Sequence, residues 1–460
     1  MRNPGKTWSS FVLAALLGSL IAGARAQTSG GWKAGVAKAD ITPKEPIWMA
    51  GFGSRNHPSE GVRQDLYVKA LALQDETGKI SVLETVDLVD TKRELWDVVA
   101  ERCEKKFGLT RDRMVFNESH SHSGPVVSRL LIPSYYPLDA TQEAVVRRYT
   151  AEFLDKAVEV VGLAIGNLAP ATLEFDQGFA GIAVNRRRVR QRSLPGPVDQ
   201  DVPVLAVRDA EGKLRAIVVG YSCHATALMD YQISGDWPGY AQEEIEKAHP
   251  GATALFVQGC GADSNALPRR TVELARMYGQ ILAAAVEEVI GAKMTPLAGP
   301  LKTAFERVDV PFRTPPTRDE LLRALKDGSD AERQRAQRLL KLLDRDGKFV
   351  DRYPYPVEVW QFGGGLKFIA LGGEVVADYA LRLKGQLGWD TTWVAGYSND
   401  VFAYIPSLRV LKEGGYEGGD AMAGEPFPGP FGAAVEEIVV EKVMDLVKAT
   451  NPDRSPGPGR

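Results

Sequence analysis

Residues 114–125 read Met-Val-Phe-Asn-Glu-Ser-His-Ser-His-Ser-Gly-Pro, and this stretch joins a strand pattern to a dense polar motif. The apolar start predicts a strand from Met114 to Glu118, and the Ser-Gly-Pro that follows ends it. His120 and His122 stand two residues apart at the end of this strand, so their imidazoles are expected on the same side of the sheet. The pair can bind one metal ion together, or divide into a ligand and a base.

Similar short runs rich in Val, Ile and aromatic residues recur along the chain and alternate with segments of helical period. This alternation is typical of an α/β protein rather than an all-α or all-β protein. Strands are predicted at 35–41, 68–74, 80–86, 114–118, 171–175, 202–207, 217–222, 254–258, 357–362, 368–371 and 392–396. Helices are predicted at 92–107, 145–165, 238–247, 272–290, 375–384 and 433–447.

The composition is typical of a soluble globular protein. The chain has 460 residues, 44% of them hydrophobic, and 56 Lys+Arg nearly balance 59 Asp+Glu, which excludes a mainly disordered or coiled-coil chain. A formal net charge of -3 provides no basic excess to neutralise phosphates, so nucleic acid is not expected as a partner. Beyond residue 26, no segment is long and apolar enough to span a bilayer.

The N-terminus has the pattern of a targeting segment. Arg2 and Lys6 precede an apolar run over residues 11–22, and Ala24-Arg25-Ala26 follows as a small-x-small cleavage site. We expect residues 1–26 to be removed as a signal peptide, which would place the mature protein in a secreted or periplasmic compartment. The alternative is an uncleaved membrane anchor, which needs about 20 apolar residues, and this run is shorter and interrupted.

Three cysteines, Cys103, Cys223 and Cys260, allow at most one disulfide bridge. Cys223 and Cys260 both lie beside polar motifs and form the best candidate pair. Two buried free thiols remain the alternative, because free cysteine is itself among the most buried residue types.

A charged segment, residues 317–343, differs from the rest of the chain. Thr317-x-x-Glu320 and Ser329-x-x-Glu332 are two capping boxes, which predict a hairpin of short helices. This hairpin is expected to be either a lid over a site or a solvated insertion. The tail, residues 451–460, is expected to be frayed. Five leucines of the hairpin are expected either to line an apolar groove or to pack on the body of the protein: Leu321, Leu322, Leu325, Leu339 and Leu340.

His224, in the motif Tyr221-Ser-Cys-His-Ala225, follows another predicted strand. Zinc takes nitrogen, oxygen or sulfur donors at four positions, so His224 is a natural third donor beside His120 and His122. The chain has only five histidines, and three of them fall in these two motifs. The pattern therefore favours a metal site over the alternative that each histidine is a satisfied polar residue of the core.

Further polar loops follow other predicted strands. Gln258-Gly-Cys-Gly-Ala-Asp-Ser-Asn265 is a glycine-rich turn whose amides can bind an oxyanion, or simply a tight turn that needs positive φ. It is not G-x-S-x-G and no Walker lysine follows, so neither a serine-hydrolase elbow nor a nucleotide site is supported. Glu374 follows two glycines where a helix is predicted to open, and Tyr404 and Tyr416 lie in polar loops. A carboxylate and a phenol there are possible oxygen donors, and exposed turn residues are the alternative.

The segment from Asn117 to Pro125 resembles the T-H-T-H-S-G-P signature of the neutral (alkaline, non-lysosomal) ceramidases. The resemblance begins at Gly35-Val-Ala-Lys-Ala-Asp-Ile-Thr-Pro43 and runs to the Tyr416-Glu-Gly418 element. In that family a zinc ion is held by the first His of the pair, a second His after a strand, a Glu in a G-E helix opening and a Tyr in an S-N-x-x-x-x-Y loop. The resemblance therefore implies a Zn2+ site, and the matching ligand positions are His120, His224, Glu374 and Tyr404.

The resemblance also implies roles for residues around the metal. The second histidine of the pair and an arginine in an N-R dipeptide serve proton transfer and substrate binding in the family, and they match His122 and Arg186. A further active-site tyrosine of the family follows the metal tyrosine at a fixed spacing, which corresponds to Tyr416.

The sequence departs from the family pattern at two points. The family loop G-D-V-S-P-N carries a serine proposed as a nucleophile or substrate contact; aligned on Asp263, its place falls on Asn265, with Ser264 one position earlier. The family also has a C-terminal immunoglobulin-like domain, whereas this sequence ends shortly after Tyr416. We therefore expect a neutral ceramidase-like catalytic domain over residues 27–450, with mixed β-sheets sandwiched by helices and without that C-terminal domain.

Together these features predict a secreted zinc-dependent amidohydrolase of neutral ceramidase type, which hydrolyses the N-acyl amide of ceramide to a fatty acid and a sphingoid base. His122 would act as the general base, and Arg186 and Tyr416 would orient the substrate or stabilise the oxyanion. The expected partner is a small-molecule or lipid substrate, with peripheral contact to lipid surfaces. Two alternatives stay open: a zinc hydrolase acting on a different amide or a glycan-derived polar molecule, and a secreted binding protein without turnover.

Overall fold

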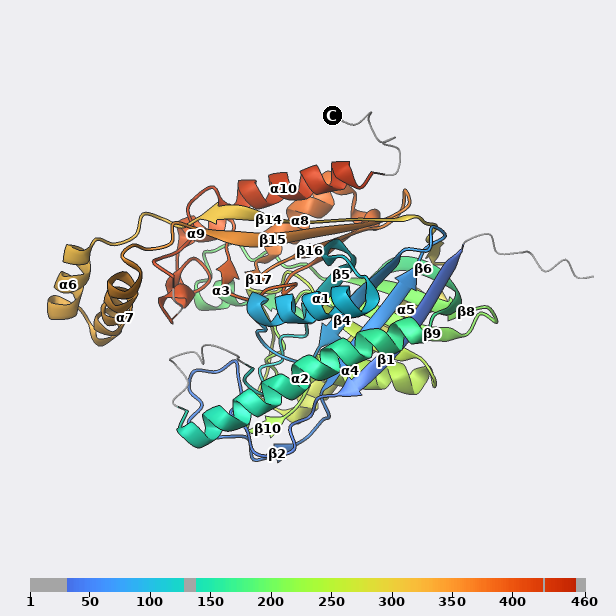
Figure 1. Cartoon of the computed structure of the whole chain (residues 1–460), viewed down its shortest axis with the longest axis horizontal. Helices are drawn as coiled ribbons and strands as arrows, with labels where there is room; N and C mark the ends of the chain where they lie inside the picture. The colour runs from blue at the N-terminus through green and yellow to red at the C-terminus, as the bar shows by residue number, and fades with distance from the viewer. Residues whose placement is uncertain (1–30, 128–137, 425–426, 452–460) are drawn as a thin grey trace, which may run out of the picture.

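The computed structural model describes residues 31–127, 138–424 and 427–451, and Figure 1 shows their arrangement. Two β-sheets share a buried interface, and helices cover the outer face of each sheet. The predicted α/β fold with mixed sheets between helices is confirmed. Within these ranges there is no immunoglobulin-like sandwich, and no helix is long and apolar enough to cross a membrane. The predicted signal peptide lies outside the described residues, as does all but the first residue of the tail.

The larger sheet has the strand order β11-β9-β8-β6-β1-β3-β4-β5, with β13 paired to β6. Its two outermost pairs, β11 with β9 and β4 with β5, are parallel, and the other neighbours are antiparallel. All the strands predicted for this part of the chain form. They are β1 (Trp32–Asp40), β3 (Tyr67–Gln74), β4 (Ile80–Val86), β5 (Met114–Glu118), β6 (Ala169–Phe179), β8 (Asp201–Asp209), β9 (Leu214–Tyr221) and β11 (Thr253–Gln258); the two-residue strand β13 (Thr295–Pro296) was not predicted.

The smaller sheet has the order β14-β15-β16-β18, in which β16 and β18 are parallel. Its strands are β14 (Leu301–Pro311), β15 (Arg352–Phe362), β16 (Lys367–Leu371) and β18 (Thr392–Ala395). Strand β14 was not predicted, because charged residues interrupt its apolar ones and it is an edge strand with a partly exposed surface. It nevertheless pairs with β15 along its whole length.

The hydrophobic core consists of buried clusters that lie between the helices and the sheets and between the two sheets. Helices α1 and α2 pack on one half of the larger sheet, α4 and α5 on its other half, and α8 and α10 on the outer face of the smaller sheet. Leu71 and Val218 of the larger sheet meet Trp360 and Phe368 of the smaller one in a further buried cluster. The helices are α1 (Arg93–Phe107), α2 (Ala140–Gly166), α4 (Asp236–Ala248), α5 (Val272–Gly291), α8 (Ala377–Leu387) and α10 (Val435–Ala449).

Several short elements order the loops that carry the polar motifs. Three two-stranded pairs form: β2 (Gly61–Val62) with β10 (Gln232–Ile233), β7 (Ala183–Asn185) with β12 (Ser264–Ala266), and β17 (Glu374–Val375) with β19 (Tyr404–Ile405). The remaining short helices are α3 (Arg186–Arg190), α9 (Leu408–Glu413), η1 (Arg111–Arg113), η2 (Trp389–Thr391) and η3 (Asp420–Gly424).

The predicted helical hairpin forms and projects from one end of the molecule (Figure 1). Helices α6 (Arg318–Asp327) and α7 (Asp330–Asp346) both begin with the expected capping box. The second helix continues beyond the predicted end at residue 343, and it stops where Gly347 adopts a left-handed φ of 73°.

The leucines of this hairpin pack mainly on one another. Leu321 and Leu339 form a small core with Ala336, and Leu340 packs against it, whereas Leu322 and Leu325 are exposed. Burial of these leucines therefore comes mainly from the packing of the two helices on each other, while Leu321 and Leu339 also border Pro428 and Pro430 outside the hairpin.

The three cysteines are buried, and none forms a disulfide. Cys223 lies in the core cluster under α4 and α5, while Cys260 belongs to the separate cluster under α8 and α10. The candidate bridge therefore does not form, and the alternative of buried free thiols holds.

Candidate active site

The predicted site residues meet where several strand ends come together. At the end of β5, Asn117 Oδ1 accepts a hydrogen bond from the Gln258 N–H of β11 at 2.8 Å. Its Nδ2 donates to the Gly396 carbonyl, just after β18, at 2.8 Å. One buried side chain thus ties the loops after three strands together. No sequence signal pointed to this role of Asn117 beyond its place in a polar motif.

His120, His122 and His224 form one buried cluster, in which one ring nitrogen of each lies within 4.8 Å of the others. The H-x-H pair converges for a reason different from the predicted one. Strand β5 ends at Glu118, and His120 has a left-handed backbone φ of 56°. A turn, rather than the two-residue repeat of a strand, therefore brings the His120 and His122 Nε2 atoms to 3.1 Å. A left-handed φ is uncommon outside glycine and is typical of functional turns.

Main-chain carbonyls orient two of the three imidazoles. The Nδ1 atom of His120 lies 2.6 Å from the Val89 carbonyl oxygen, and Nδ1 of His224 lies 2.9 Å from that of Gly261. Because a carbonyl only accepts hydrogen bonds, each Nδ1 carries the proton and each Nε2 presents a lone pair to the cluster. This arrangement is the usual second layer of support for metal-binding histidines.

The loop that supplies the Val89 carbonyl is itself held by a buried carboxylate. Glu118 accepts hydrogen bonds from the Thr91 N–H at 2.7 and 2.9 Å and from Trp96 Nε1 at 3.3 Å. Glu118 thus links the end of β5 to the residues that orient His120.

His122 has different surroundings. Its Nε2 faces His120, but its Nδ1 makes no hydrogen bond with any described residue. The ring packs on Phe52 at 4.8 Å between centroids and lies against Gly51, where a Cβ atom would come within 2.5 Å of it. Burial, together with the neighbouring imidazoles of His120 and His224, lowers the pKa of His122 well below its usual range. His122 is therefore neutral and lacks the carbonyl support that the other two rings have.

Glu374 and Tyr404 are neighbours because their short strands pair. In the parallel pair of β17 and β19, Glu374 stands opposite Tyr404. Glu374 was expected to open a helix, but α8 begins only at Ala377, because the preceding residues take part in this pairing. Glu374 Oε2 lies 3.3 Å from His120 Nε2 and 3.1 Å from His224 Nε2, and Tyr404 Oη lies 3.4 Å from His224 Nε2.

These donors fit a metal ion. Zinc bonds of about 2.0–2.1 Å in a tetrahedron place the donors about 3.3 Å apart, close to the distances seen here. Burial lowers the pKa of His224 to about 4, which favours its neutral form. The Glu374 Oε2 atom, buried without a hydrogen-bond partner, faces the Nε2 lone pairs of His120 and His224. A buried negative charge facing lone pairs needs a positive charge to balance it, and a metal ion bound between these donors would supply one.

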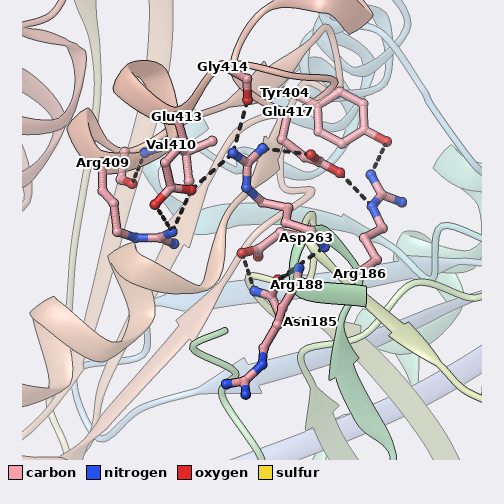
Figure 2. Close-up of polar contacts among 12 residues, drawn as sticks. Asn185, Arg186, Arg188, Asp263, Tyr404, Arg409, Val410, Glu413, Gly414 and Glu417 are labelled. Atoms are coloured by element: carbon pink, nitrogen blue, oxygen red, sulfur yellow. Dashed lines mark hydrogen bonds and ion pairs between the residues drawn. The ribbon is translucent and has the colours of Figure 1, made fainter. Parts of the chain in front are cut away.

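Arg186 and Tyr416 lie on the Tyr404 side of the cluster, and Figure 2 shows the contacts of the arginine. Arg186 donates to Tyr404 Oη at 3.1 Å and to Glu417 Oε1 at 2.7 Å. Its guanidinium lies 5.5 Å from the Tyr404 ring centroid and 5.7 Å from that of Tyr416. The two tyrosine rings are 5.2 Å apart, and Tyr416 is 46% exposed, so it borders the solvent side.

Ser264 and Asn265 support the backbone around His224, and neither residue lines the cavity at the histidine cluster. The Ser264 carbonyl accepts the His224 N–H at 3.0 Å, and the Ser264 hydroxyl is buried without a hydrogen-bond partner. Asn265 Oδ1 accepts a hydrogen bond from Thr226 Oγ1 at 3.3 Å. Both residues shape the backbone that presents His224.

A cavity of about 270 Å³ opens onto the cluster. Its lining includes the apolar residues Val401, Phe402 and Met422 and also the charged pair Asp90 and Lys92, whose side chains are 3.5 Å apart. These wall residues were not among the predicted site residues, because ordinary loop positions carry no motif. The lining comprises Gly51, Gly53, Val89, Asp90, Lys92, His120, His122, Glu374, Val401, Phe402, Ala403, Tyr404, Tyr416, Ala421 and Met422.

The fold and the site together define a mixed α/β protein whose buried histidine cluster is compatible with a metal site. Residues 32–295 match the family model described as neutral/alkaline non-lysosomal ceramidase, N-terminal, and the chain belongs to this family. The family supports a ceramidase-type amide hydrolase. No curated protein matches the chain.

Solved structures show the same fold. The neutral ceramidase from Pseudomonas aeruginosa has a TM-score of 0.70 at 19% identity, covering 94% of this chain and 77% of that one. A ceramidase complexed with C2 gives a TM-score of 0.70 at 17% identity, with the same coverage of 94% and 77%. The fold similarity thus extends beyond the segment matched by the family model, which ends at residue 295.

Proposed function

We propose that this protein is a secreted, zinc-dependent amidohydrolase that hydrolyses the N-acyl amide of ceramide to a fatty acid and a sphingoid base. One observation carries the proposal: the unpaired, buried Glu374 carboxylate oxygen faces two histidine Nε2 atoms whose lone pairs point toward it. Family membership supports the reaction class. The signal-peptide pattern of residues 1–26 supports secretion.

The mechanism assigns four residues to the metal and three to the reaction. His120, His224, Glu374 and Tyr404 would hold the zinc ion, which when bound would polarise the amide carbonyl and lower the pKa of a water toward about 7. The neutral His122 takes a proton from the attacking water and returns it to the amine nitrogen as the C–N bond breaks. Arg186 and Tyr416 donate hydrogen bonds to the negative charge that develops on the amide oxygen.

The lining of the cavity suits an amphiphilic amide. Val401, Phe402 and Met422 form an apolar wall that an acyl chain can contact, and each buried CH₂ contributes about 0.8 kcal/mol. Asp90 and Lys92 can hydrogen-bond to the hydroxyl groups of a sphingoid base. Peripheral contact with a lipid surface would deliver such a substrate.

No serine nucleophile is needed in this mechanism. Water attacks the carbonyl carbon directly, so no acyl group is transferred to the protein. The buried Ser264 hydroxyl and the Asn265 amide do not line the cavity, which agrees with a role in supporting His224.

A second candidate function keeps the metal and changes the substrate to a compact, water-soluble amide. The volume of the cavity favours it, because about 270 Å³ lies just below the usual range of about 300–1,000 Å³ for small-molecule sites. The charged pair in the lining would then bind a polar amine portion.

Substrate scope separates the two candidates. The full-length, metal-loaded protein is assayed with ceramides of graded acyl length in detergent and with soluble N-acyl amides, and His122→Ala is the inactive control. A ceramidase is expected to gain up to about fourfold in kcat/KM for each CH₂ that the wall can bury. A flat profile with better turnover of the soluble amides supports the second candidate. Hydrolysis of no amide at all would contradict both.

A further inference from the structure

Glu417 is a buried carboxylate that bridges two consecutive arginines (Figure 2). Its Oε1 accepts the Arg186 Nε–H at 2.7 Å, and its Oε2 accepts a hydrogen bond from Arg187 NH1 at 2.9 Å. The side chains of Glu417 and Arg187 are 3% and 4% exposed. Both charges are therefore shielded from water. Removing one partner of such a buried ion pair costs far more than removing one partner of a surface pair.

Arg187 is fixed independently of the site. It also donates to Glu413 Oε2 at 3.1 Å and to the Gly414 carbonyl at 2.9 Å, and Arg409 binds Glu413 at 2.8 Å. Arg187 is not among the residues that line the cavity at the histidine cluster. Arg187 thus anchors the Glu417 carboxylate and does not itself reach the cavity.

Glu417 is the single ion-pair partner of Arg186 among the described residues, whereas Arg187 also pairs with Glu413. Among these residues, the Arg186 guanidinium otherwise donates one hydrogen bond, from NH2 to Tyr404 Oη at 3.1 Å, and lies over the rings of Tyr404 and Tyr416. An arginine side chain has many rotamers, so one oriented by a single carboxylate loses its orientation when that carboxylate is lost.

We infer that Glu417 is a positioning residue: with Arg187 as its anchor, it holds the Arg186 guanidinium so that one N–H stays on the Tyr404 oxygen. The inference rests on the proposed function, because it concerns the site proposed there. It assigns Glu417 an effect on both the metal-binding donor set and the turnover, transmitted through Arg186.

The test compares Glu417→Gln with the matched control Glu413→Gln, which removes a carboxylate from the same Arg187 without touching Arg186. All measurements use the full-length protein. Chelator competition gives the Zn2+ dissociation constant, steady-state kinetics with an N-acyl amide give kcat and KM, and calorimetry gives the thermal stability. We expect Glu417→Gln to weaken Zn2+ binding about 10-fold and to lower kcat by about 10- to 100-fold with little change in KM. Glu413→Gln is expected to keep both within about threefold.

The double variant Arg186→Ala/Glu417→Gln decides whether Glu417 acts through Arg186. We expect it to be no worse than Arg186→Ala alone, because the two residues act as a unit. Losses that multiply, or equal effects of Glu417→Gln and Glu413→Gln, would overturn the inference. Glu417→Asp, which keeps the charge but shortens its reach, replaces Glu417→Gln if that variant does not fold, and a partial loss is then expected.

The measurement of Zn2+ affinity distinguishes a failure of this inference from a failure of the proposed function. If the wild-type protein hydrolyses no amide, the proposed function fails, while equal weakening of Zn2+ binding in Arg186→Ala and Glu417→Gln still supports the role of Glu417. Zn2+ affinity that is unchanged in Glu417→Gln would overturn it whatever the substrate.

Discussion

The nitrogen donors and the oxygen donors of the proposed metal site are held by different parts of the molecule. His120 and His224 are oriented by the main-chain carbonyls of Val89 and Gly261. Tyr404, by contrast, receives its hydrogen bond from the side chain of Arg186, and the metal-facing oxygen of Glu374 has no hydrogen-bond partner. The histidines lie within the residues matched by the family model, and the two oxygen donors lie beyond them.

This difference has a physical consequence. A main-chain carbonyl is kept when the side chain of its own residue is substituted, so the histidine half of the site is oriented by the backbone, which Glu118 supports on the His120 side. The oxygen half depends on substitutable side chains and on a pairing of two-residue strands. Substitutions near the oxygen donors should therefore tune metal affinity and turnover in steps, whereas loss of a donor itself should be abrupt.

The largest effect is expected for Glu374→Gln. Loss of the only carboxylate among the proposed donors should weaken Zn2+ binding by about 10³-fold or more and remove measurable turnover. The metal-free variant should melt at the same or a higher temperature than the metal-free parent, because the new amide can donate a hydrogen bond to an imidazole Nε2. Calorimetry in the presence of chelator measures this. A much lower melting temperature would mean that the carboxylate supports the fold itself.

His122→Ala tests the histidine that lacks carbonyl support. General acid–base groups contribute about 10²- to 10⁴-fold, and a loss of kcat in that range is expected with KM little changed. Steady-state kinetics at saturating zinc measure it. Restoration of full activity by added zinc would show that the residue acts only as a ligand.

Tyr404→Phe should have a smaller effect. The ring keeps its stacking on His224, with centroids 6.4 Å apart, and only the phenol oxygen is lost. We expect Zn2+ affinity to fall by about 10-fold, as for a site reduced to three protein ligands, with thermal stability nearly unchanged. Chelator competition provides the affinity. An affinity equal to that of the parent would exclude Tyr404 from the donor set.

Ser264→Ala is expected to have the smallest effect, with kcat/KM within about threefold of the parent. Removal of a buried hydroxyl without a hydrogen-bond partner should leave stability unchanged or slightly raised. Mass spectrometry after mixing substrate with the parent protein is the complementary measurement. An acyl adduct on Ser264 would contradict the direct attack of water.

Much of the fold could be predicted from local pattern. Strands β4 and β5 begin and end at the predicted residues, because both are short apolar runs bounded by clear turn signals. The capping boxes at Thr317 and Ser329 likewise identified both helices of the hairpin. Strand β14 was missed because its stability comes from pairing with β15 rather than from its own pattern.

The site was predicted to the extent that residue types and spacing reveal it. The histidines, Glu374, Tyr404 and Arg186 stand in motifs, and the structure brings them together. Asn117 and Glu417 act through contacts with residues far away in the chain, and no local pattern reveals such contacts. The left-handed turn at His120 was also missed, because it arises from packing around the strand end.

The central claim is that the chain holds one metal ion through His120, His224, Glu374 and Tyr404 and leaves His122 free for proton transfer. Elemental analysis of the protein purified without chelators tests it most directly, with His120→Ala and His122→Ala beside the parent. The account predicts one zinc ion per chain in the parent and in His122→Ala, and nearly none in His120→Ala. No stoichiometric metal in the parent, or equal loss of metal in both variants, would contradict it.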